Sequence, residues 1–435
     1  MEAPDLLVDL TYLPDGWTLR PLREGLRSIK NGTTATQELA PPGHPVSRIE
    51  TLTDAGLNPR RVRYIRHLDM EELAKFELQP GDILLSHINS EPQLGRTAVY
   101  DGDPPGLVHG MNLLCLRVDP QALDPYYLHF LLAWYRRSGA FIRLAGRAVG
   151  QSSVNQGKLG GMVVPYPPLV EQRAIANVLR TVQQAMEATK QVIGASESVR
   201  RGVRRHLMTY GPVPVDQTTL VPLREWVGLG GTVMRCPSAW DRATLGGLTE
   251  KSRPICYGVL KPGPFAPDGV AMIRIQDLGS SRVSQRNLHF ISPNLDHEYT
   301  RSKLRGGEVL ISIQGTIGLV AVCPDELAGA NISRTIAVID PDNRVDNRFL
   351  FHYLRHLTDL GQYEAEGSTR RSLNIGTIRE IVVPIPPANE QSLIAAALDL
   401  LDAKVRVEEG HRDALGSLAA TAMGDLMSAR RRVAA

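Results

Sequence analysis

The sequence predicts an α+β protein in which two similar α/β domains are separated by two long helices that form an antiparallel coiled coil, with a pseudo-two-fold internal repeat. The first observation is a stretch that occurs twice, Val163–Leu179 and Val382–Leu398, with Val-Val-Pro, Pro-Pro, Glu-Gln, Ile-Ala and a final Leu shared at an offset of 219 residues. The second is that each stretch begins an apolar pattern of helical spacing. Two unrelated amphipathic helices would share neither identities nor register, so we infer a duplication.

Composition limits the class of protein. The chain has 435 residues, of which 43% are hydrophobic and 22% charged, enough for two or three domains with their own cores. No apolar run approaches the ~18 residues of a membrane span, and the first residues do not resemble a signal peptide, so we expect a cytoplasmic protein. The four cysteines, at 115, 236, 256 and 323, have no spacing typical of a metal site or a disulfide framework.

The first globular domain is expected over residues 13–168, after an N-terminal arm of residues 1–12. Short apolar runs separated by Gly, Pro, Asn and Asp indicate strands in RYIRHLD, GDILLSHI, LLCLRVD and GGMVVPY. The segment DPYYLHFLLAWYRRSG is typical of a helix. This mixture predicts an α+β domain.

A long spacer helix is expected over residues 169–211. The paired prolines Pro167-Pro168 fit a helix start because they lack an N–H to donate, and Glu171 then lies where the helix dipole favours a carboxylate. Apolar residues follow at alternating spacings of four and three, at Ile175, Leu179, Val182 and Met186. Gly211-Pro212 ends the helix, and residues 212–236 are expected to be a linker.

The second domain, residues 237–387, repeats the first in order, and residues 388–435 form the second spacer helix. The matched segments are Ile65–Asp69 with Ile273–Asp277, GDILLS with GEVLIS, VDP at Val118 with IDP at Ile339, and YLHFLLAW with FLFHYLRH. The apolar pattern of the second helix is Ile394, Leu398, Leu401 and Val405. In this alignment the stretch from Asp69 to Gly81 is shorter than that from Asp277 to Gly307, which predicts that the domains bind different targets.

Charges on the two helices predict their pairing. Basic residues dominate the first helix and acidic residues the second, so antiparallel pairing brings Arg200, Arg201, Arg204 and Arg205 beside Asp399 and Asp402. We expect such pairs to be exposed, each contributing ~0.2–1 kcal/mol. Because the halves repeat each other, a half-chain of residues 1–215 is expected to self-associate.

Motifs of catalysis are absent from the sequence. There is no GxxxxGK[ST] phosphate loop, and Gly228–Gly231 lies in the linker rather than between a strand and a helix. Tyr166-Pro167-Pro168 lacks the amide and the following aromatic ring of an amino-methyltransferase loop, and His297-Glu298 lacks the second histidine of a zincin helix. We therefore expect a binding protein with no catalytic, cofactor or metal site of its own.

Polar loops at similar positions in the two domains are suited to reading DNA. Arginine can bind guanine, amides can bind adenine, and hydroxyls can reach phosphates. A solvated surface charge remains the alternative for any one of these residues, and their paired occurrence favours recognition. The candidates are Arg60, Arg61, Arg63, Arg143, Arg147, Gln151 and Ser152 in the first domain, and Lys251, Arg253, Tyr257, Lys261, Arg301, Lys303, Ser368, Thr369, Arg370 and Arg371 in the second.

The order of domain, PxPPxxEQ motif and long helix, given twice, resembles the specificity subunit of type I restriction-modification systems, HsdS. The resemblance covers nearly the whole chain and is carried by Pro165–Gln172 and Pro384–Gln391, with GDIL and GEVL upstream. It implies that residues 13–168 and 237–387 are target recognition domains, each reading one half of a bipartite, asymmetric DNA site. It also implies two methyltransferase subunits that use S-adenosylmethionine, and motor-nuclease subunits that use ATP and Mg²⁺, as partners in a bacterial or archaeal cytoplasm.

Two alternatives fit the same sequence. One is an orphan specificity subunit that serves a methylation-only complex. The other is a two-domain scaffold that binds proteins instead of DNA. Sequence-selective protection of DNA by the purified complex would distinguish a DNA reader from a scaffold.

Overall fold

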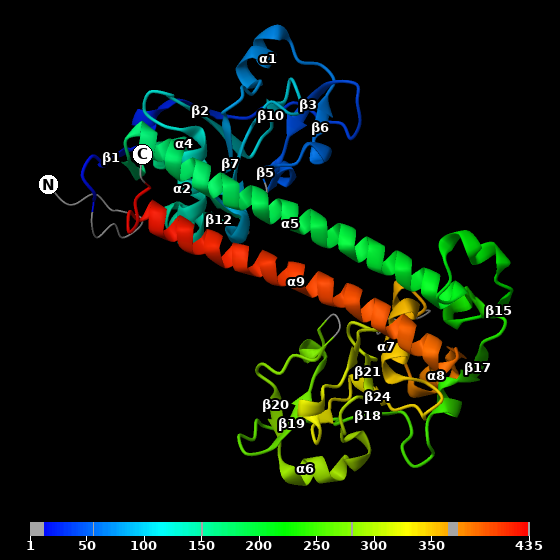
Figure 1. Cartoon of the computed structure of the whole chain (residues 1–435). Coiled ribbons are helices and arrows are strands. Elements are labelled where there is room, and N and C mark those ends of the chain that lie inside the picture. The colour runs from blue at the N-terminus through cyan, green and yellow to red at the C-terminus, as the bar shows by residue number, and fades with distance from the viewer. Residues whose placement is uncertain (1–12, 55, 149–150, 280–281, 364–372, 434–435) are drawn as a thin grey trace. The chain divides into compact units, whose positions relative to one another are not determined.

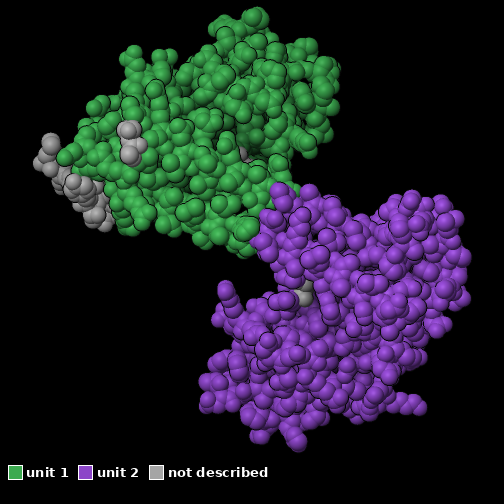
Figure 2. Space-filling view, in the orientation of Figure 1, with its two compact units in different colours: residues 1–191, 410–435 green, residues 192–409 purple. Residues whose placement is uncertain are grey.

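The computed structural model describes residues 13–54, 56–148, 151–279, 282–363 and 373–433. The chain forms two compact units: unit 1 joins residues 1–191 to residues 410–435, and unit 2 comprises residues 192–409 (Figure 2). Both long helices pass from one unit to the other. Each unit therefore holds one globular domain and a segment of each long helix.

Unit 1 is built on an antiparallel sheet of strand order β2-β11-β7-β9, whose central strands are buried along almost their whole length and share a core with helix α2. Strands β2 and β7 and helix α2 are labelled in Figure 1. A second sheet has the order β10-β3-β6, and a third the order β12-β13-β8. The strands are β1 Thr18–Pro21, β2 Leu26–Asn31, β3 His44–Ser47, β4 Leu52–Thr53, β5 Gly56–Leu57, β6 Arg63–Ile65, β7 Ile83–Ser86, β8 Ile88–Asn89, β9 Thr97–Val99, β10 Val108–His109, β11 Leu113–Val118, β12 Gly146–Ala148, β13 Gln151–Ser153 and β14 Val163–Tyr166. The helices are α1 Met70–Phe76, α2 Pro125–Arg137, α3 Ala140–Leu144, α4 Gln156–Gly161 and α5 Leu169–Tyr210, which continues into unit 2.

Unit 2 has the same construction, with a sheet of order β18-β24-β21-β22 beside helix α7 and a second sheet of order β20-β19-β23. Its strands are β15 Leu223–Val227, β16 Val233–Pro237, β17 Asp241–Thr244, β18 Cys256–Tyr257, β19 Val270–Ile273, β20 His289–Ile291, β21 Val309–Ser312, β22 Val320–Val322, β23 Asn331–Ile332, β24 Ile336–Ile339 and β25 Val382–Ile385. Its helices are α6 Pro293–Glu298, α7 Asn347–Asp359, α8 Ile375–Glu380 and α9 Ala388–Met427, which continues into unit 1.

The predicted internal repeat is confirmed, and the strands fix its register. Strands β3, β6 and β7 of unit 1 begin at residues 44, 63 and 83, and β19, β20 and β21 of unit 2 begin at 270, 289 and 309, each 226 positions later. The pairing also recurs, since β3 is antiparallel to β6 and parallel to β10 as β19 is to β20 and β23. The entrances to α5 and α9 differ by 219 positions, as expected.

One segment match from the sequence was wrong. Ile273–Asp277 corresponds to residues 47–51 rather than to Ile65–Asp69, because both occupy the end of the middle strand and a following 3-10 turn, with the same capping arrangement at Arg48 and Arg274. In the corrected alignment Arg48 and Gly81 are as far apart in sequence as Arg274 and Gly307. The unequal stretch is thus no evidence that the two domains differ.

The long helices pair antiparallel within each unit. In unit 1 the start of α5, at Ile175 and Leu179, shares a core with Met423 and Met427 near the end of α9. In unit 2 Leu207, near the end of α5, shares a core with residues 394 and 398 near the start of α9. The predicted buried stripe is therefore present in both units.

The expected charge register of the helix pair is confirmed in part. Arg200 Nη1 lies 3.0 Å from Asp402 Oδ1, and Arg204 Nη2 lies 4.0 Å from the same oxygen. The pairs are buried rather than exposed, since the side chains of Arg204 and Asp402 are 1% and 2% exposed. Asp399 instead binds Arg348 and His352 of α7, and Arg201 pairs with Glu197 of its own helix.

The glutamate of each PxPPxxEQ motif joins a globular domain to the start of a long helix through a hydrogen bond from a tryptophan. Trp17 Nε1 donates to Glu171 Oε2 over 3.1 Å, and Trp240 Nε1 donates to Glu390 Oε2 over 3.0 Å. Each glutamate therefore does more than favour the helix dipole, because it also receives an indole N–H from the first strand region of its domain. The expected linker is likewise partly ordered, since residues 223–227 and 233–237 form the antiparallel hairpin β15–β16.

Candidate nucleic-acid interface

Arg60 and Arg61 lie in a short 3-10 turn and Arg63 begins strand β6, as the sequence predicted for a turn before a strand. Asn58 Oδ1 accepts a hydrogen bond of 3.0 Å from the backbone N–H of Arg60 and caps the short 3-10 turn over residues 59–61. Arg60 and Arg61 are exposed and Arg63 is half-buried. Among the described residues no carboxylate is paired with any of the three, so their charges are available to a phosphate or a base edge.

The polar loop after α2 contains the other candidates of unit 1. Arg143 belongs to α3 and its Nη1 donates to the Ser138 carbonyl over 2.9 Å. Arg147 and Gln151 lie on the paired strands β12 and β13, and their side chains are outside the described part of the molecule. Ser152 lies on β13, the middle strand of this small sheet, and is 6% exposed. Its burial argues against the predicted contact with DNA.

In unit 2 the structure brings together two segments that lie far apart in the sequence, residues 253–256 and 301–303. The Cys256 thiol donates to the Arg301 carbonyl over 3.4 Å, and Arg253 Nη2 donates to the Lys303 carbonyl over 3.3 Å. Tyr257 is 47% exposed. Lys251, Lys261 and Arg301 are also exposed.

Arg253 is a correction to the predicted set. Its guanidinium, 11% exposed, is held by the carboxylate of Glu308 and lies 3.3 Å from Asp340 Oδ2. Glu308 also accepts from the backbone N–H groups of Arg305 and Gly306 over 2.6 and 2.9 Å. Arg253 therefore neutralises a buried carboxylate and stabilises the fold rather than facing a ligand.

Lys303 forms an ion pair but stays partly exposed. Lys303 Nζ donates to Asp296 Oδ2 over 2.7 Å while its side chain stays 43% exposed. Ser368, Thr369, Arg370 and Arg371 lie outside the described residues.

The corrected register reveals residues that the sequence reading missed. The positions of Arg61 and Arg63 are occupied in unit 2 by Asn287 and His289. Asn287 and His289 line a hollow of about 450 Å³ with Phe265, Arg274, Gln285, Leu288 and Phe290. The equal spacing from Arg48 to Gly81 and from Arg274 to Gly307 was the signal that could have found them.

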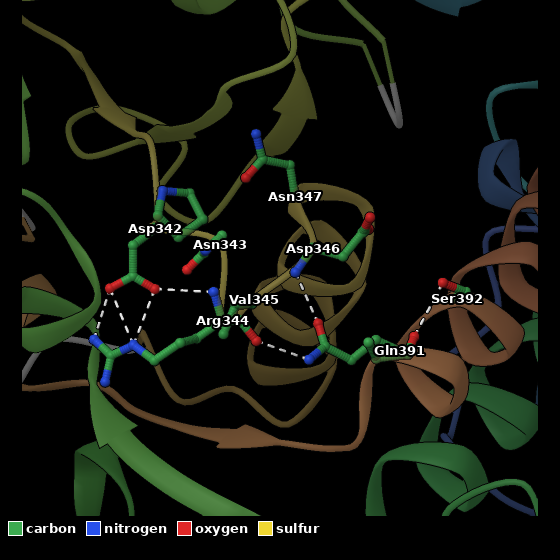
Figure 3. Close-up of a pocket in the computed structure, with 10 residues that line it drawn as sticks. Asp342, Asn343, Arg344, Val345, Asp346, Asn347, Gln391 and Ser392 are labelled. Atoms are coloured by element: carbon green, nitrogen blue, oxygen red, sulfur yellow. Dashed lines mark hydrogen bonds and ion pairs between the residues drawn. The ribbon is translucent and has the colours of Figure 1, made fainter.

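A second hollow, of about 470 Å³, lies between the loop before α7 and the start of α9 (Figure 3). It is crossed by Gln391, whose Oε1 accepts from Asp346 N over 2.7 Å and whose Nε2 donates to the Arg344 carbonyl over 2.9 Å. Gln172 makes the equivalent contacts in unit 1, with Asp124 N at 2.8 Å and the Ala122 carbonyl at 3.0 Å. Because both units use it, we interpret this feature as a structural joint between domain and helix.

One group of possible metal ligands occurs among the described residues, at His352, Asp399 and Asp402, with ligand atoms within 4.8 Å of one another. Arg200 and Arg355 lie 3.0 and 2.8 Å from the Asp402 carboxylate, and Arg348 binds Asp399. Burial and the positive charge of nearby arginines hold the pKa of His352 well below its usual value, so its ring stays neutral. The arginines already neutralise the carboxylates, which makes the group an ion-pair network.

Comparison with known proteins agrees with this architecture. The family model described as type I restriction modification DNA specificity domain matches residues 14–194 and 270–416. The putative type I restriction enzyme MjaX specificity subunit of Methanocaldococcus jannaschii is 30% identical over 430 residues, covering 98% of this chain and 96% of that protein. The EcoBI specificity subunit of Escherichia coli is 27% identical over 245 residues, covering 55% of this chain and 51% of that protein.

Two solved structures share the fold. The S subunit of a type I restriction-modification system from M. genitalium aligns with a TM-score of 0.54 at 17% identity, over 96% of this chain and 98% of that one. A chain from a study of complex assembly and conformational transition of the type I R-M system aligns with a TM-score of 0.51 at 19% identity, over 96% and 98%. In the described residues no helix is long and apolar enough to cross a membrane. On the match to the family model and to the Methanocaldococcus relative, the chain belongs to the type I restriction-modification DNA specificity family.

Proposed function

We propose that this chain is the non-catalytic DNA-reading subunit of a type I restriction-modification complex, with unit 1 and unit 2 each reading one half of a bipartite, asymmetric site. The observation that carries the proposal is a repeated framework with different side chains at equivalent positions. Arg61 and Arg63 of unit 1 are replaced by Asn287 and His289 in unit 2. Arginine suits guanine and amides suit adenine, so the two units suit different half-sites.

The partners we propose are two adenine methyltransferase subunits and motor-nuclease subunits. The relatives are named as specificity subunits of type I restriction enzymes, and one solved relative comes from a study of complex assembly. S-adenosylmethionine, ATP and Mg²⁺ would be bound by those partners, and the complex would act in the cytoplasm, where its DNA is.

Helix α9 offers a surface for such a partner within unit 2. Leu393, Leu400 and Val407 recur every seven residues and are 58%, 72% and 57% exposed, on a different face of the helix from the buried stripe. An exposed heptad stripe fits a further helix packed against the pair. We therefore expect Leu400→Asp to reduce co-purification of the methyltransferase subunit, while Leu220→Asp, at a residue 78% exposed in the short 3-10 helix Val215–Leu220, leaves it unchanged.

The test of the function is genome-wide adenine methylation in cells that express the methyltransferase subunit with and without this chain. We expect methylation of one bipartite motif that depends on the chain. Methylation that is unaltered by removal of the chain would contradict the proposal. If the native host methylates the motif but does not cleave unmethylated DNA that carries it, the chain belongs to a methylation-only complex.

A further inference from the structure

The hollow beside strand β20 has aromatic walls and an amide rim. The ring of Phe265 stands edge-on to those of His289 and Phe290, with centroids 6.0 and 5.9 Å away and interplanar angles of 69° and 75°. Phe265 is nevertheless 57% exposed, so one side of its ring is open to a ligand. The exposed side chains of Gln285 and Asn287 complete the hollow.

A hydrogen bond from Arg274 holds the turn that contains Asn287. Arg274 Nη2 donates to the Asn287 carbonyl over 2.8 Å, while Nε and Nη2 bind the two oxygens of the buried Asp277 over 3.1 and 3.2 Å. Asn287 itself has a φ of 57°, in the left-handed region that asparagine tolerates. The amide is thus presented from a rigid backbone, and Arg274 is a positioning residue.

Two features of this hollow point to a ligand with hydrogen-bonding edges. His289 Nε2 is inaccessible to solvent and has no hydrogen-bond partner among the described residues. A shift of the exposed Phe265 ring would open this nitrogen to a polar group of a ligand, which would supply the missing partner. The exposed Arg286 adjoins Asn287 and has no ion pair in the described part of the chain, which leaves its charge for a phosphate.

We propose that this hollow reads one A·T base pair in the major groove, an inference that rests on the proposed DNA-reading function of unit 2. Asparagine and glutamine side chains bind the N6 and N7 edge of adenine, and phenylalanine makes apolar contact with the thymine methyl group. The hollow holds both chemistries side by side, in Asn287 and Gln285 on its rim and in Phe265 on its wall. Asn287 and Phe265 are thereby assigned as specificity-determining residues of the half-site that unit 2 reads.

The experiment uses the full chain co-expressed with its methyltransferase subunit, with methylation mapped across the genome. Asn287→Gly keeps the left-handed backbone and removes the amide, and Phe265→Ala removes the ring. Each is expected to relax one A·T position in one half-site, with about tenfold less discrimination against G·C. The other half-site and the spacer should be unchanged. Phe265→Leu should retain the preference because it keeps an apolar contact, and Val227→Ala, at an exposed residue of strand β15, is the matched control.

The outcomes separate this inference from the proposed function. A wild-type chain that directs no bipartite motif would refute the function itself. A wild-type motif that neither Asn287→Gly nor Phe265→Ala alters would refute the hollow as a base reader. Uniformly weaker methylation with no relaxed position would also refute it, because a contact with phosphates produces that result. Thermal unfolding of the purified variants is expected to match the wild type, since both side chains are exposed.

Discussion

Glu171 is a single carboxylate that joins two distant segments of unit 1 to the start of α5. It accepts from Trp17 Nε1 over 3.1 Å, and from Arg432 Nε and Nη2 over 3.0 and 2.8 Å. Burial raises the pKa of Glu171, but the hydrogen bonds from Arg432 and Trp17 outweigh burial and leave its pKa below the ordinary value. The glutamate of PxPPxxEQ therefore has a structural role in unit 1, because it joins the globular domain and the end of the chain to the start of α5.

We predict that Glu171→Gln lowers the free energy of unfolding at pH 7 by about 1–3 kcal/mol, because Arg432 loses a charged acceptor. Since the folded pKa is depressed, this contribution is present above the unfolded value of 4.5 and is lost as the pH falls through and below it. Urea unfolding should thus show a lower free energy of unfolding for the variant than for the wild type at pH 7, and a smaller difference between them below pH 4. Glu187→Gln is the control, because Glu187 is 42% exposed and pairs with Lys190 over 3.8 Å. An equal difference at both pH values would contradict this role.

At the scale of elements, the helix pair of unit 2 buries charged residues beside its apolar stripe. Asp402 of α9 accepts from Arg200 of α5 over 3.0 Å and from Arg355 of α7 over 2.8 Å. The equivalent of Asp402 in unit 1, 219 positions earlier, is Gln183. Gln183 is half-buried and its Nε2 donates to the Asp54 carbonyl over 3.3 Å, so the repeated helices have diverged in the contacts made at this position.

A neighbouring pair shows the same divergence. In unit 2 Arg348 binds Asp399. The equivalent residues of unit 1 are Tyr126 and Arg180, and the Arg180 guanidinium lies 3.9 Å from the centroid of the Tyr126 ring. An ion pair between helix and domain in unit 2 is replaced by a cation–π contact in unit 1.

We predict that Asp402→Ala destabilises the protein by about 3–5 kcal/mol, because it leaves buried guanidiniums without their carboxylate. Asp413→Ala is the matched control on the same helix. Its pair with Arg412 is exposed, at 70% and 45%, so its loss should cost no more than ~1 kcal/mol. Chemical unfolding of both variants measures the difference, and similar losses would show that burial does not decide the strength of these pairs.

What the sequence predicted well depends on local causes. The helix entrances were predictable because prolines and the Glu-Gln pair act within one turn, and the predicted stripes hold the buried Ile175, Leu179, Ile394 and Leu398. Arg253 was misread because its acceptors, Glu308 and Asp340, lie far along the chain and only the fold brings them near. The match of Ile65 to Ile273 failed because strands of three or four residues carry too little pattern to fix a register.

At the scale of the whole molecule, the buried charges oppose the expected self-association of a half-chain. If two copies of residues 1–215 paired, helix α5 of one copy would pack on α5 of the second copy, in the position that α9 occupies in the full chain. Gln183 would then replace Asp402 beside Arg200 and Arg204. Buried arginines without a carboxylate cost several kcal/mol, so we now predict that the half-chain is monomeric.

The substitution Gln183→Asp should restore the missing carboxylate and convert the half-chain into a dimer. Gln184→Asp is the control, because Gln184 is exposed and its charge would face solvent. Light scattering across a concentration series measures the association. A wild-type half-chain that dimerises as tightly as the Gln183→Asp variant would show that the arginines do not specify which helices pair.

The last prediction concerns the two long helices as a ruler between the half-sites. Both pass from one unit to the other near a glycine, Gly194 in α5 and Gly410 in α9, and a side chain at either position would meet open space. Four residues inserted at both places would leave intact the Arg200–Asp402 pair of unit 2 and the Glu171–Arg432 pair of unit 1. The insertion adds ~6 Å and ~40° of rotation, given ~1.5 Å and ~100° per residue.

Two base pairs of DNA add ~7 Å and ~70°, so the altered complex should prefer a spacer longer by one or two base pairs. The half-site bases should stay the same, because the loops that we propose face DNA are untouched. An insertion in α5 alone should instead destabilise the chain, since it shifts the buried register between Arg200 and Asp402. Methylation mapping distinguishes the results: full activity at the original spacer would show that the helices only tether the units, and changed half-site bases would place recognition in the helices themselves.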